Sequence, residues 1–227
     1  MASIAVIIPA LNEAGNIGQL VKDVRASLHA KVIVVDNNSS DLTADEARQA
    51  GAQVVCESKR GYGYACAAGV ASACQADILV FLDGDCSFSP AELPVLLAPI
   101  FKGQAEFVIG SRELGHIDPG AMPSHQRFGN WLTARMMNTL YGLSVSDVGP
   151  YRAIRRQILI EMNMREMTYG WPTEMMVKAA RRGLQIVEVP VSYHSRRSGR
   201  SKVSGTLRGT ILASWTILRV TLQYAWR

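Results

Sequence analysis

The sequence predicts an α/β protein built on one mostly parallel sheet with helices on both faces. Short apolar, β-branched runs alternate with helical stretches through the first half of the chain, as in successive strand–helix–strand units. Runs such as "VIVV" (32–35) and "ILVFL" (78–82) are apolar at every position, which is typical of parallel strands buried on both sides. A length of 227 residues with 48% hydrophobic content suits one domain with a complete core.

In the first half, each predicted strand is a short run rich in Val and Ile that ends in a polar loop, and a helix follows that loop. The predicted elements, in chain order, are a strand at 4–10, a helix at 17–29, a strand at 31–36, a helix at 42–50, a strand at 52–57, a helix at 64–73 and a strand at 77–83.

The second half is less regular, and its segment 144–156 has no predicted element. A loop at 115–123 is rich in Gly and Pro, which indicates disorder or function. The tail 206–226 has two Arg within its apolar length, so we expect it to lie on a surface and not to cross a membrane. The remaining predictions are helices at 91–101, at 125–141 and from 171, and strands at 105–112 and 184–193.

Several classes of protein are disfavoured by composition. Asn12 and Glu13 interrupt the region where a signal peptide needs its apolar stretch, and no later segment offers about 18 uncharged apolar residues. We therefore expect a cytoplasmic protein without membrane spans. The four cysteines have no metal-ligand spacing, and we expect them to be reduced.

The charge is concentrated near the carboxyl end. Residues 181–208 hold seven Lys or Arg against the single acid Glu188, within a formal net charge of +5. This imbalance indicates an anionic partner. Nucleic acid, lipid headgroups and a phosphorylated substrate would each satisfy it.

The residues that follow the predicted strands are where we expect a ligand site, because the crevice of a parallel α/β sheet lies beyond the carboxyl ends of its strands. Asp83 and Asp85 follow the fourth strand, and their spacing puts both carboxylates on one side of extended backbone. Such a pair favours Mg²⁺ or Mn²⁺, with Ser87 as a third oxygen ligand. The alternative is a surface turn, because Asp-Gly is a favoured turn pair.

Three further segments carry weaker signals. Asp36 ends the strand 31–36, where a carboxylate can accept hydrogen bonds from a ribose hydroxyl or a base, although its surroundings also suit a turn. The segment "RGYGYACAAG" (60–69) matches a dinucleotide fingerprint weakly, because Cys66 takes the third Gly position. The loop "HSRRSGRSKVSG" (194–205) holds four cations that suit phosphate binding. A solvated loop is the alternative.

Six motifs occur in order: "IIPALNE", "VVDNNSSD", "LDGD", "GSR", "DVGPYRAIRR" and "GRSKVS". Together they span residues 4–206, and this set resembles glycosyltransferase family 2, in particular its dolichyl- and polyprenyl-phosphate hexosyltransferases. The resemblance implies a GT-A fold, Mg²⁺ or Mn²⁺ as cofactor, and inverting transfer of a hexose from a UDP- or GDP-sugar to a polyprenyl or dolichyl phosphate. It also implies no role for nucleic acid.

The same resemblance assigns roles to single residues. Asp83 and Asp85 match the metal pair that grips the donor diphosphate. The other matched positions are Pro9, Leu11, Glu13 and Asp36 at the nucleotide, Arg112, Asp147 and Arg152 on the acceptor side, and Arg200, Ser201 and Lys202 in a phosphate-contacting loop.

The acceptor is less well defined than the donor. A lipid phosphate is already anionic and needs no strong base, whereas a hydroxyl acceptor would need Asp147 or Glu174 as a general base. The chain has Cys86, Ser87 and Phe88 where related polyprenyl-phosphate enzymes often have Leu-Gln and a His or Asn.

The resemblance divides the chain into a catalytic domain at 1–206 and an amphipathic helix at 207–227. Within the domain, 1–112 form the nucleotide-sugar half and 113–206 the acceptor half. The segment 128–143 and the tail mix Trp, Leu and Met with Arg, so we expect peripheral contact with the cytoplasmic face of a membrane. Ordinary core packing is the alternative.

Two other functions fit less well. A phosphatase of the haloacid dehalogenase type also has an Asp-x-Asp signature after an apolar strand. In those phosphatases the signature follows the first strand, whereas in this chain it follows the fourth. A non-catalytic module that binds anionic lipid or nucleic acid would gain nothing from Asp83 and Asp85.

Overall fold

The computed structural model describes residues 2–197 and 207–225. Within these residues the chain forms one seven-stranded sheet in the order β3-β2-β1-β4-β6-β5-β7. The strands are β1 (Ile4–Ala10), β2 (Lys31–Asp36), β3 (Gln53–Cys56), β4 (Ile78–Phe81), β5 (Phe107–Ser111), β6 (Arg152–Arg155) and β7 (Ile186–Pro190).

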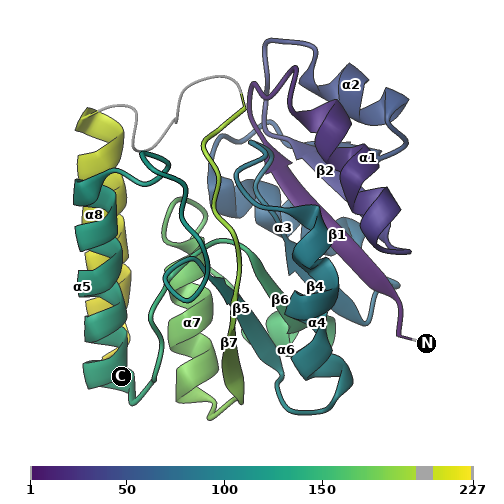
Figure 1. The fold of residues 1–227 in the computed structure, drawn as a ribbon. Helices are drawn as coiled ribbons and strands as arrows, with labels where there is room; N and C mark the ends of the chain where they lie inside the picture. Colours follow the sequence, from purple (N-terminus) through teal and green to yellow (C-terminus); the bar gives the residue numbers. More distant parts are fainter. Residues whose placement is uncertain (1, 198–206, 226–227) are drawn as a thin grey trace.

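Helices cover both faces of this sheet (Figure 1). They are α1 (Ile17–Ser27), α2 (Thr43–Gln49), α3 (Tyr62–Ser72), α4 (Leu93–Phe101), α5 (Ser124–Tyr141), α6 (Arg156–Glu161), α7 (Trp171–Arg181) and α8 (Leu207–Gln223), and a 3-10 turn at Pro90–Glu92 precedes α4. The predicted α/β class, with a mostly parallel sheet between helices, is confirmed.

The core consists of two layers, because successive side chains of a strand point to opposite faces. In β1, Val6 and Ile8 belong to the cluster formed with α1 and α4. Ala5 and Ile7 belong to the cluster formed with α3, α6 and α7. The uniformly apolar strands that the sequence shows are therefore buried on both sides, as predicted.

The order of strands in the second half could not be read from the sequence. β6 lies within the segment that had no predicted element, and it pairs antiparallel with both β4 and β5. β5 then pairs with β7 in parallel. The inserted β6 joins the amino-terminal and carboxyl-terminal halves of the chain in one continuous sheet.

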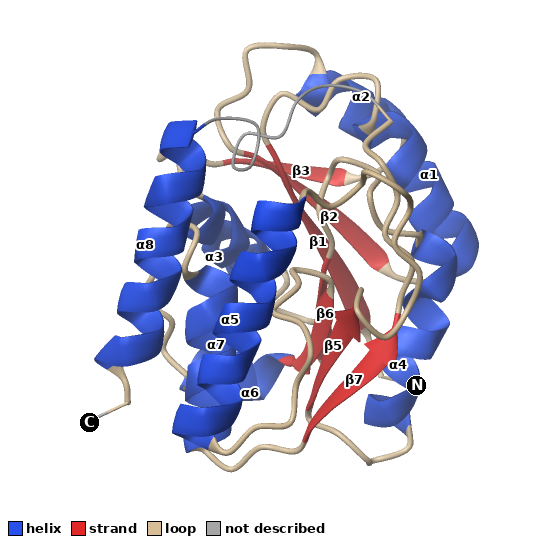
Figure 2. Cartoon of the chain, turned by 60° about the vertical axis from the view of Figure 1, so that its left-hand side comes forward, coloured by secondary structure: helices blue, strands red, loops and turns tan. Residues whose placement is uncertain are grey.

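Helices α5 and α8 form an outer layer that packs on α7. The two helices lie side by side in both Figure 1 and Figure 2. Gly142, at φ 65°, ends α5 in the left-handed conformation that favours glycine. At the same end of this pair, in and just after the carboxyl-terminal part of α8, Tyr224 donates from its hydroxyl to Glu174 Oε1 at 2.8 Å, and Arg219 pairs with Glu166 at 2.6 Å. In the described part of the chain, no helix combines the length and hydropathy needed to cross a bilayer.

Candidate active site

The carboxyl ends of β1, β2 and β4 meet at one edge of the sheet, and the predicted nucleotide-binding residues gather there. Ala10 of β1 lies opposite Asp36 of β2 in the parallel register. Glu13 and Asp36 are buried polar residues in this region. Pro9 lies in β1 and Leu11 in the loop that follows it.

The loops after β1 and β2 are joined by hydrogen bonds. The Glu13 N–H donates to Thr43 Oγ1 at 2.8 Å, and the Ala14 N–H donates to Asp41 Oδ2 at 3.1 Å. The Ser40 N–H donates to Asn12 Oδ1 at 2.8 Å. These bonds fix one wall of the crevice before any ligand binds.

Asn37 organises the opposite wall, a role that the sequence did not reveal. Its side-chain amide donates to the carbonyl oxygens of Glu57 (3.1 Å) and Lys59 (2.7 Å), and its Oδ1 accepts from the Gly61 N–H at 2.8 Å. Asn37 is buried, so these bonds are shielded from water. The segment 57–61 is thereby held against the end of β2.

The two aspartates lie beyond the end of β4, as the sequence predicted. Asp85 is buried, and its Oδ1 accepts from the Ser87 N–H at 3.0 Å. Asp83 Oδ1 accepts from the Tyr62 hydroxyl at 3.2 Å. Burial, and then the like charge of Asp85, raise the pKa of Asp83 to about 7.

A divalent cation fits this group of oxygens. Two neighbouring carboxylates and a raised pKa indicate a need for positive charge. Ser87 Oγ is buried and has no hydrogen-bond partner among the residues that the structure describes. Within that part of the chain, no three His, Cys, Asp or Glu side chains group to hold a metal by themselves. Oxygen ligands such as these suit Mg²⁺ or Mn²⁺, which share their coordination with substrate phosphate oxygens.

Arg196 is a site residue that sequence reasoning did not single out from its basic loop. Its Nη2 lies 2.6 Å from Asp85 Oδ2, and its Nη1 lies 3.6 Å from Glu13 Oε1. The guanidinium therefore bridges the loops that follow β1 and β4. Arg200, Ser201 and Lys202, predicted in the same loop, lie outside the described residues.

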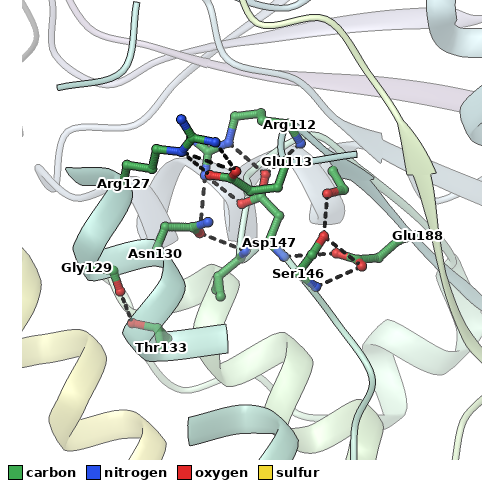
Figure 3. A network of polar contacts seen from close by, with 12 residues as sticks. Arg112, Glu113, Arg127, Gly129, Asn130, Thr133, Ser146, Asp147 and Glu188 are labelled. Atoms are coloured by element: carbon green, nitrogen blue, oxygen red, sulfur yellow. Dashed lines mark hydrogen bonds and ion pairs between the residues drawn. The ribbon is translucent and has the colours of Figure 1, made fainter. Parts of the chain in front are cut away.

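On the acceptor side, Arg112 and Asp147 form a buried ion pair (Figure 3). Arg112 donates from Nε to Asp147 Oδ2 at 2.8 Å and from Nη2 to Oδ1 at 2.7 Å, and its backbone N–H adds a bond of 2.7 Å to Oδ2. Its guanidinium also lies over the Tyr193 ring, 5.2 Å from the centroid. Burial alone would lower the pKa of Arg112, but Asp147 raises it above the ordinary value.

The segment that carries Asp147 is fixed from behind by Glu188 (Figure 3). Glu188 accepts from the Ser146 N–H at 2.8 Å and from the Asp147 N–H at 2.9 Å. Asn130 Oδ1 adds bonds from the Val148 N–H at 3.0 Å and from Arg112 Nη2 at 3.4 Å. With both carboxylate oxygens bonded to Arg112, Asp147 has the contacts of a positioning residue for Arg112. They do not favour the predicted role as general base.

Arg152 and Glu174 are also held by the fold. Arg152 is fully buried beneath the sheet edge, where it donates to the carbonyl oxygens of Gly149 and Pro172. Burial lowers its pKa to about 10. Glu174 accepts from the Glu166 N–H at 2.8 Å and pairs with Lys178 at 2.7 Å. Neither residue lines the cavity described next, so their contacts favour structural roles over the predicted catalytic and binding ones.

A cavity of about 790 Å³ extends from the aspartates to the outer helix pair. Its polar end is lined by Asp83, Asp85, Arg112 and Arg196. Its other end is mainly apolar and lies between the amino-terminal half of α5, the middle of α8 and the start of α7, with lining residues that include Phe128, Leu132, Pro172, Ala213, Ile217 and Leu218. Charged groups thus line one end of a cavity whose other end is mainly apolar.

Comparisons with known proteins agree with this geometry. The family model described as glycosyl transferase family 2 matches residues 5–162. The chain is 39% identical over 214 residues to an uncharacterized glycosyltransferase of Mycobacterium bovis, covering 93% of this chain and 94% of the relative. It is 33% identical over 225 residues to a dolichyl-phosphate hexose transferase of Haloferax volcanii, covering 97% of this chain and 94% of the relative.

Among solved structures, the fold matches glucosyl-3-phosphoglycerate synthase from Mycobacterium tuberculosis in complex with Mn²⁺, UDP-glucose and phosphoglyceric acid. The TM-score is 0.79 and the sequence identity 23%, and the match covers 99% of this chain and 80% of the other.

Proposed function

The chain belongs to glycosyl transferase family 2, and on that premise we propose that it transfers a hexose from a nucleotide sugar to a polyprenyl or dolichyl phosphate. The observation that carries the proposal is the cavity, which is charged at the aspartates and apolar between α5 and α8. A phosphate head and an isoprenoid chain have the same division of polarity. The relative named as a dolichyl-phosphate hexose transferase supports this acceptor class.

The donor would lie in the crevice at the ends of β1, β2 and β4. Pro9, Leu11, Glu13 and Asp36 would hold its nucleotide, with Asn37 keeping the segment 57–61 in place. Asp83, Asp85 and Ser87 would hold a divalent metal, Mg²⁺ or Mn²⁺, which when bound supplies positive charge to the leaving diphosphate. The predicted residues for further phosphate contact are Arg200, Ser201 and Lys202.

On the acceptor side, Arg112 would bind the lipid phosphate, with Asp147 orienting its guanidinium. An anionic phosphate oxygen then attacks the anomeric carbon as the bond to the nucleoside diphosphate breaks, which inverts the configuration at that carbon. No proton has to be removed from such an acceptor near neutral pH. Asp147 and Glu174 are already engaged by Arg112 and Lys178, which makes them poor general bases. A hydroxyl acceptor needs such a base, so these contacts favour a phosphate acceptor.

A membrane surface would supply such a lipid, and the outer helices are suited to it. Phe128, Trp131 and Trp215 are 62%, 56% and 67% exposed. Phe128 lies in the amino-terminal part of α5, and the two Trp lie near the middle of α5 and of α8. Arg127 and Arg135 line a groove beside Trp131. Aromatic side chains with neighbouring cations are typical of interfacial helices.

Sugar transfer is the direct test. The purified protein is incubated with Mn²⁺ and either UDP-glucose or GDP-mannose, with and without farnesyl phosphate, undecaprenyl phosphate or farnesol as acceptor, and products are identified by mass spectrometry. We expect a glycosylated lipid phosphate with one of these donors, and none with Asp83→Asn. Transfer only to farnesol or another hydroxyl compound would refute the phosphate acceptor.

Membrane contact is tested by flotation with vesicles that contain anionic phospholipid. We expect the wild-type protein to float with the vesicles and the Trp131→Ser/Trp215→Ser double variant to stay in the soluble fraction. A Trp171→Phe variant is the control, since Trp171 is buried. Equal flotation of wild type and double variant would contradict the assignment of this surface.

A further inference from the structure

Arg196 takes the place on Asp85 that a metal ion would need. Asp85 Oδ1 is bonded to the Ser87 N–H, so Oδ2 is the oxygen directed to a cation. Arg196 Nη2 lies 2.6 Å from this oxygen, the distance of a strong charge-assisted hydrogen bond. The side chain of Asp85 is only 5% exposed and that of Arg196 27%, so solvent screens the pair weakly.

The same guanidinium also faces the loop that follows β1. Its Nη1 lies 3.6 Å from Glu13 Oε1, and Glu13 is one of the residues proposed to hold the nucleotide. Arg196 also lines the polar end of the cavity, beside Asp83. It therefore lies between the carboxylate of Glu13 in the loop that follows β1 and the carboxylate of Asp85 in the loop that follows β4.

The contact between Arg196 and Asp85 has an electrostatic explanation. Asp83 and Asp85 are separated by one residue and are largely shielded from water, so their carboxylates repel each other, and a cation stabilises such a pair. A divalent ion in contact with Asp85 Oδ2 would meet the positive guanidinium at the same oxygen. The two cations repel, so they cannot both keep this contact at full strength.

We propose that Arg196 is a built-in competitor of the metal ion: its guanidinium neutralises Asp85 while the donor is absent, and it is displaced when metal and nucleotide bind together. The inference rests on the proposed function, because it assumes that Asp85 is a metal ligand. A bare metal ion must displace Arg196 without help, whereas a metal–nucleotide complex brings its own contacts. The enzyme thereby binds free metal weakly and metal with nucleotide well.

The test is Mn²⁺ binding without turnover, measured by the electron paramagnetic resonance signal of free Mn²⁺ at one pH and ionic strength. We expect Arg196→Gln to bind Mn²⁺ roughly tenfold more tightly than wild type in the absence of nucleotide, within the usual range of coupling between two sites. With UDP present, the difference between the two proteins should shrink.

Arg197→Gln is the matched control, because it removes the same charge from the next position, where the side chain is exposed. It should bind Mn²⁺ like wild type, which separates the direct ion pair from a general change in charge. Arg196→Lys should give an intermediate affinity. Thermal melts of each variant establish that it is folded.

Different results overturn different claims. If Arg196→Gln binds Mn²⁺ no more tightly than Arg197→Gln while all proteins bind Mn²⁺ with UDP, the competition is refuted and the proposed metal site stands. If no protein binds Mn²⁺ even with UDP, the metal part of the proposed function fails, and the inference fails with it.

Discussion

Replacement of Asp147 by Asn tests the buried ion pair on the acceptor side. The side chain of Asp147 is 0% exposed and that of Arg112 7% exposed, and Asp147 accepts from Arg112 Nε, from Arg112 Nη2 and from the Arg112 backbone N–H. Asn keeps the shape of Asp but loses the charge and replaces one acceptor oxygen with a donor. A buried guanidinium is then left without its counter-ion.

The expected loss is large because the side chain that keeps the charge is only 7% exposed and meets solvent only where it lines the cavity. Removing one partner of a buried pair costs about 3–5 kcal/mol. For a protein of this size each kcal/mol lowers the melting temperature by about 2–4 °C, so the total is roughly 6–20 °C. An exposed pair would cost about 1 kcal/mol or less.

Urea unfolding of wild type, Asp147→Asn, Arg112→Met and the double variant gives the free energy of unfolding of each protein. Together the four values form a double-mutant cycle for the ion pair. The double variant should be more stable than Asp147→Asn alone, because it no longer buries an unpaired cation. A loss below about 1 kcal/mol for Asp147→Asn would refute the reasoning. As a readout of positioning, the KM for farnesyl phosphate should rise more in Asp147→Asn than the KM for the donor.

The same variant has a characteristic pH dependence. Burial alone would raise the pKa of Asp147, but Arg112 overrides this effect and lowers the pKa below its ordinary value. The stability that the carboxylate contributes is therefore complete above the unfolded pKa of about 4 and is lost as the pH falls through the lower folded pKa. The free-energy difference between wild type and Asp147→Asn should be constant near neutral pH and shrink in acid.

Four further variants test separate features. Gly63→Ala should destabilise the protein by more than about 1 kcal/mol in urea unfolding, because its methyl would meet backbone atoms at 2.5 Å. Gly129→Ala should instead stabilise it by about 0.5–1 kcal/mol, since it lies inside α5 with no atom within 4 Å of the added carbon. Asn37→Asp should cost about 1–3 kcal/mol and speed hydrogen exchange at 57–61, because a carboxylate cannot donate to the two carbonyl oxygens. Asp83→Asn should abolish UDP-dependent Mn²⁺ binding in calorimetry without lowering the melting temperature, since it removes a like-charge repulsion; unchanged binding would contradict the metal assignment.

The amino-terminal half of the fold could be predicted because its signals are local. Each parallel strand is a continuous apolar run, and the polar residues after it mark the edge where a ligand crevice forms. Asp36, Asp83 and Asp85 could therefore be assigned to one edge of the sheet without coordinates. The parallel pairing of β1 with β2 and β4 is what brings them together.

The acceptor half depends on contacts between distant segments. Arg152 lies in a four-residue strand. Its buried guanidinium is stabilised by hydrogen bonds to the carbonyl oxygens of Gly149 and Pro172. The sequence around Arg152 does not reveal that this residue is buried, since the carbonyl groups that bind it come together only in the folded chain. For the same reason the sequence showed a basic loop but did not show which of its cations contacts Asp85. Among the described residues of that loop, Arg196 makes this contact.

The antiparallel junction between β4 and β6 has a consequence for biosynthesis. β4 is complete at residue 81, but one of its edges stays unpaired until residues 152–155 have been made. During translation an apolar strand edge is thus open, which is a template for association with other chains. A fragment of residues 1–112 would keep that edge open permanently, so we expect it to aggregate when it is expressed alone.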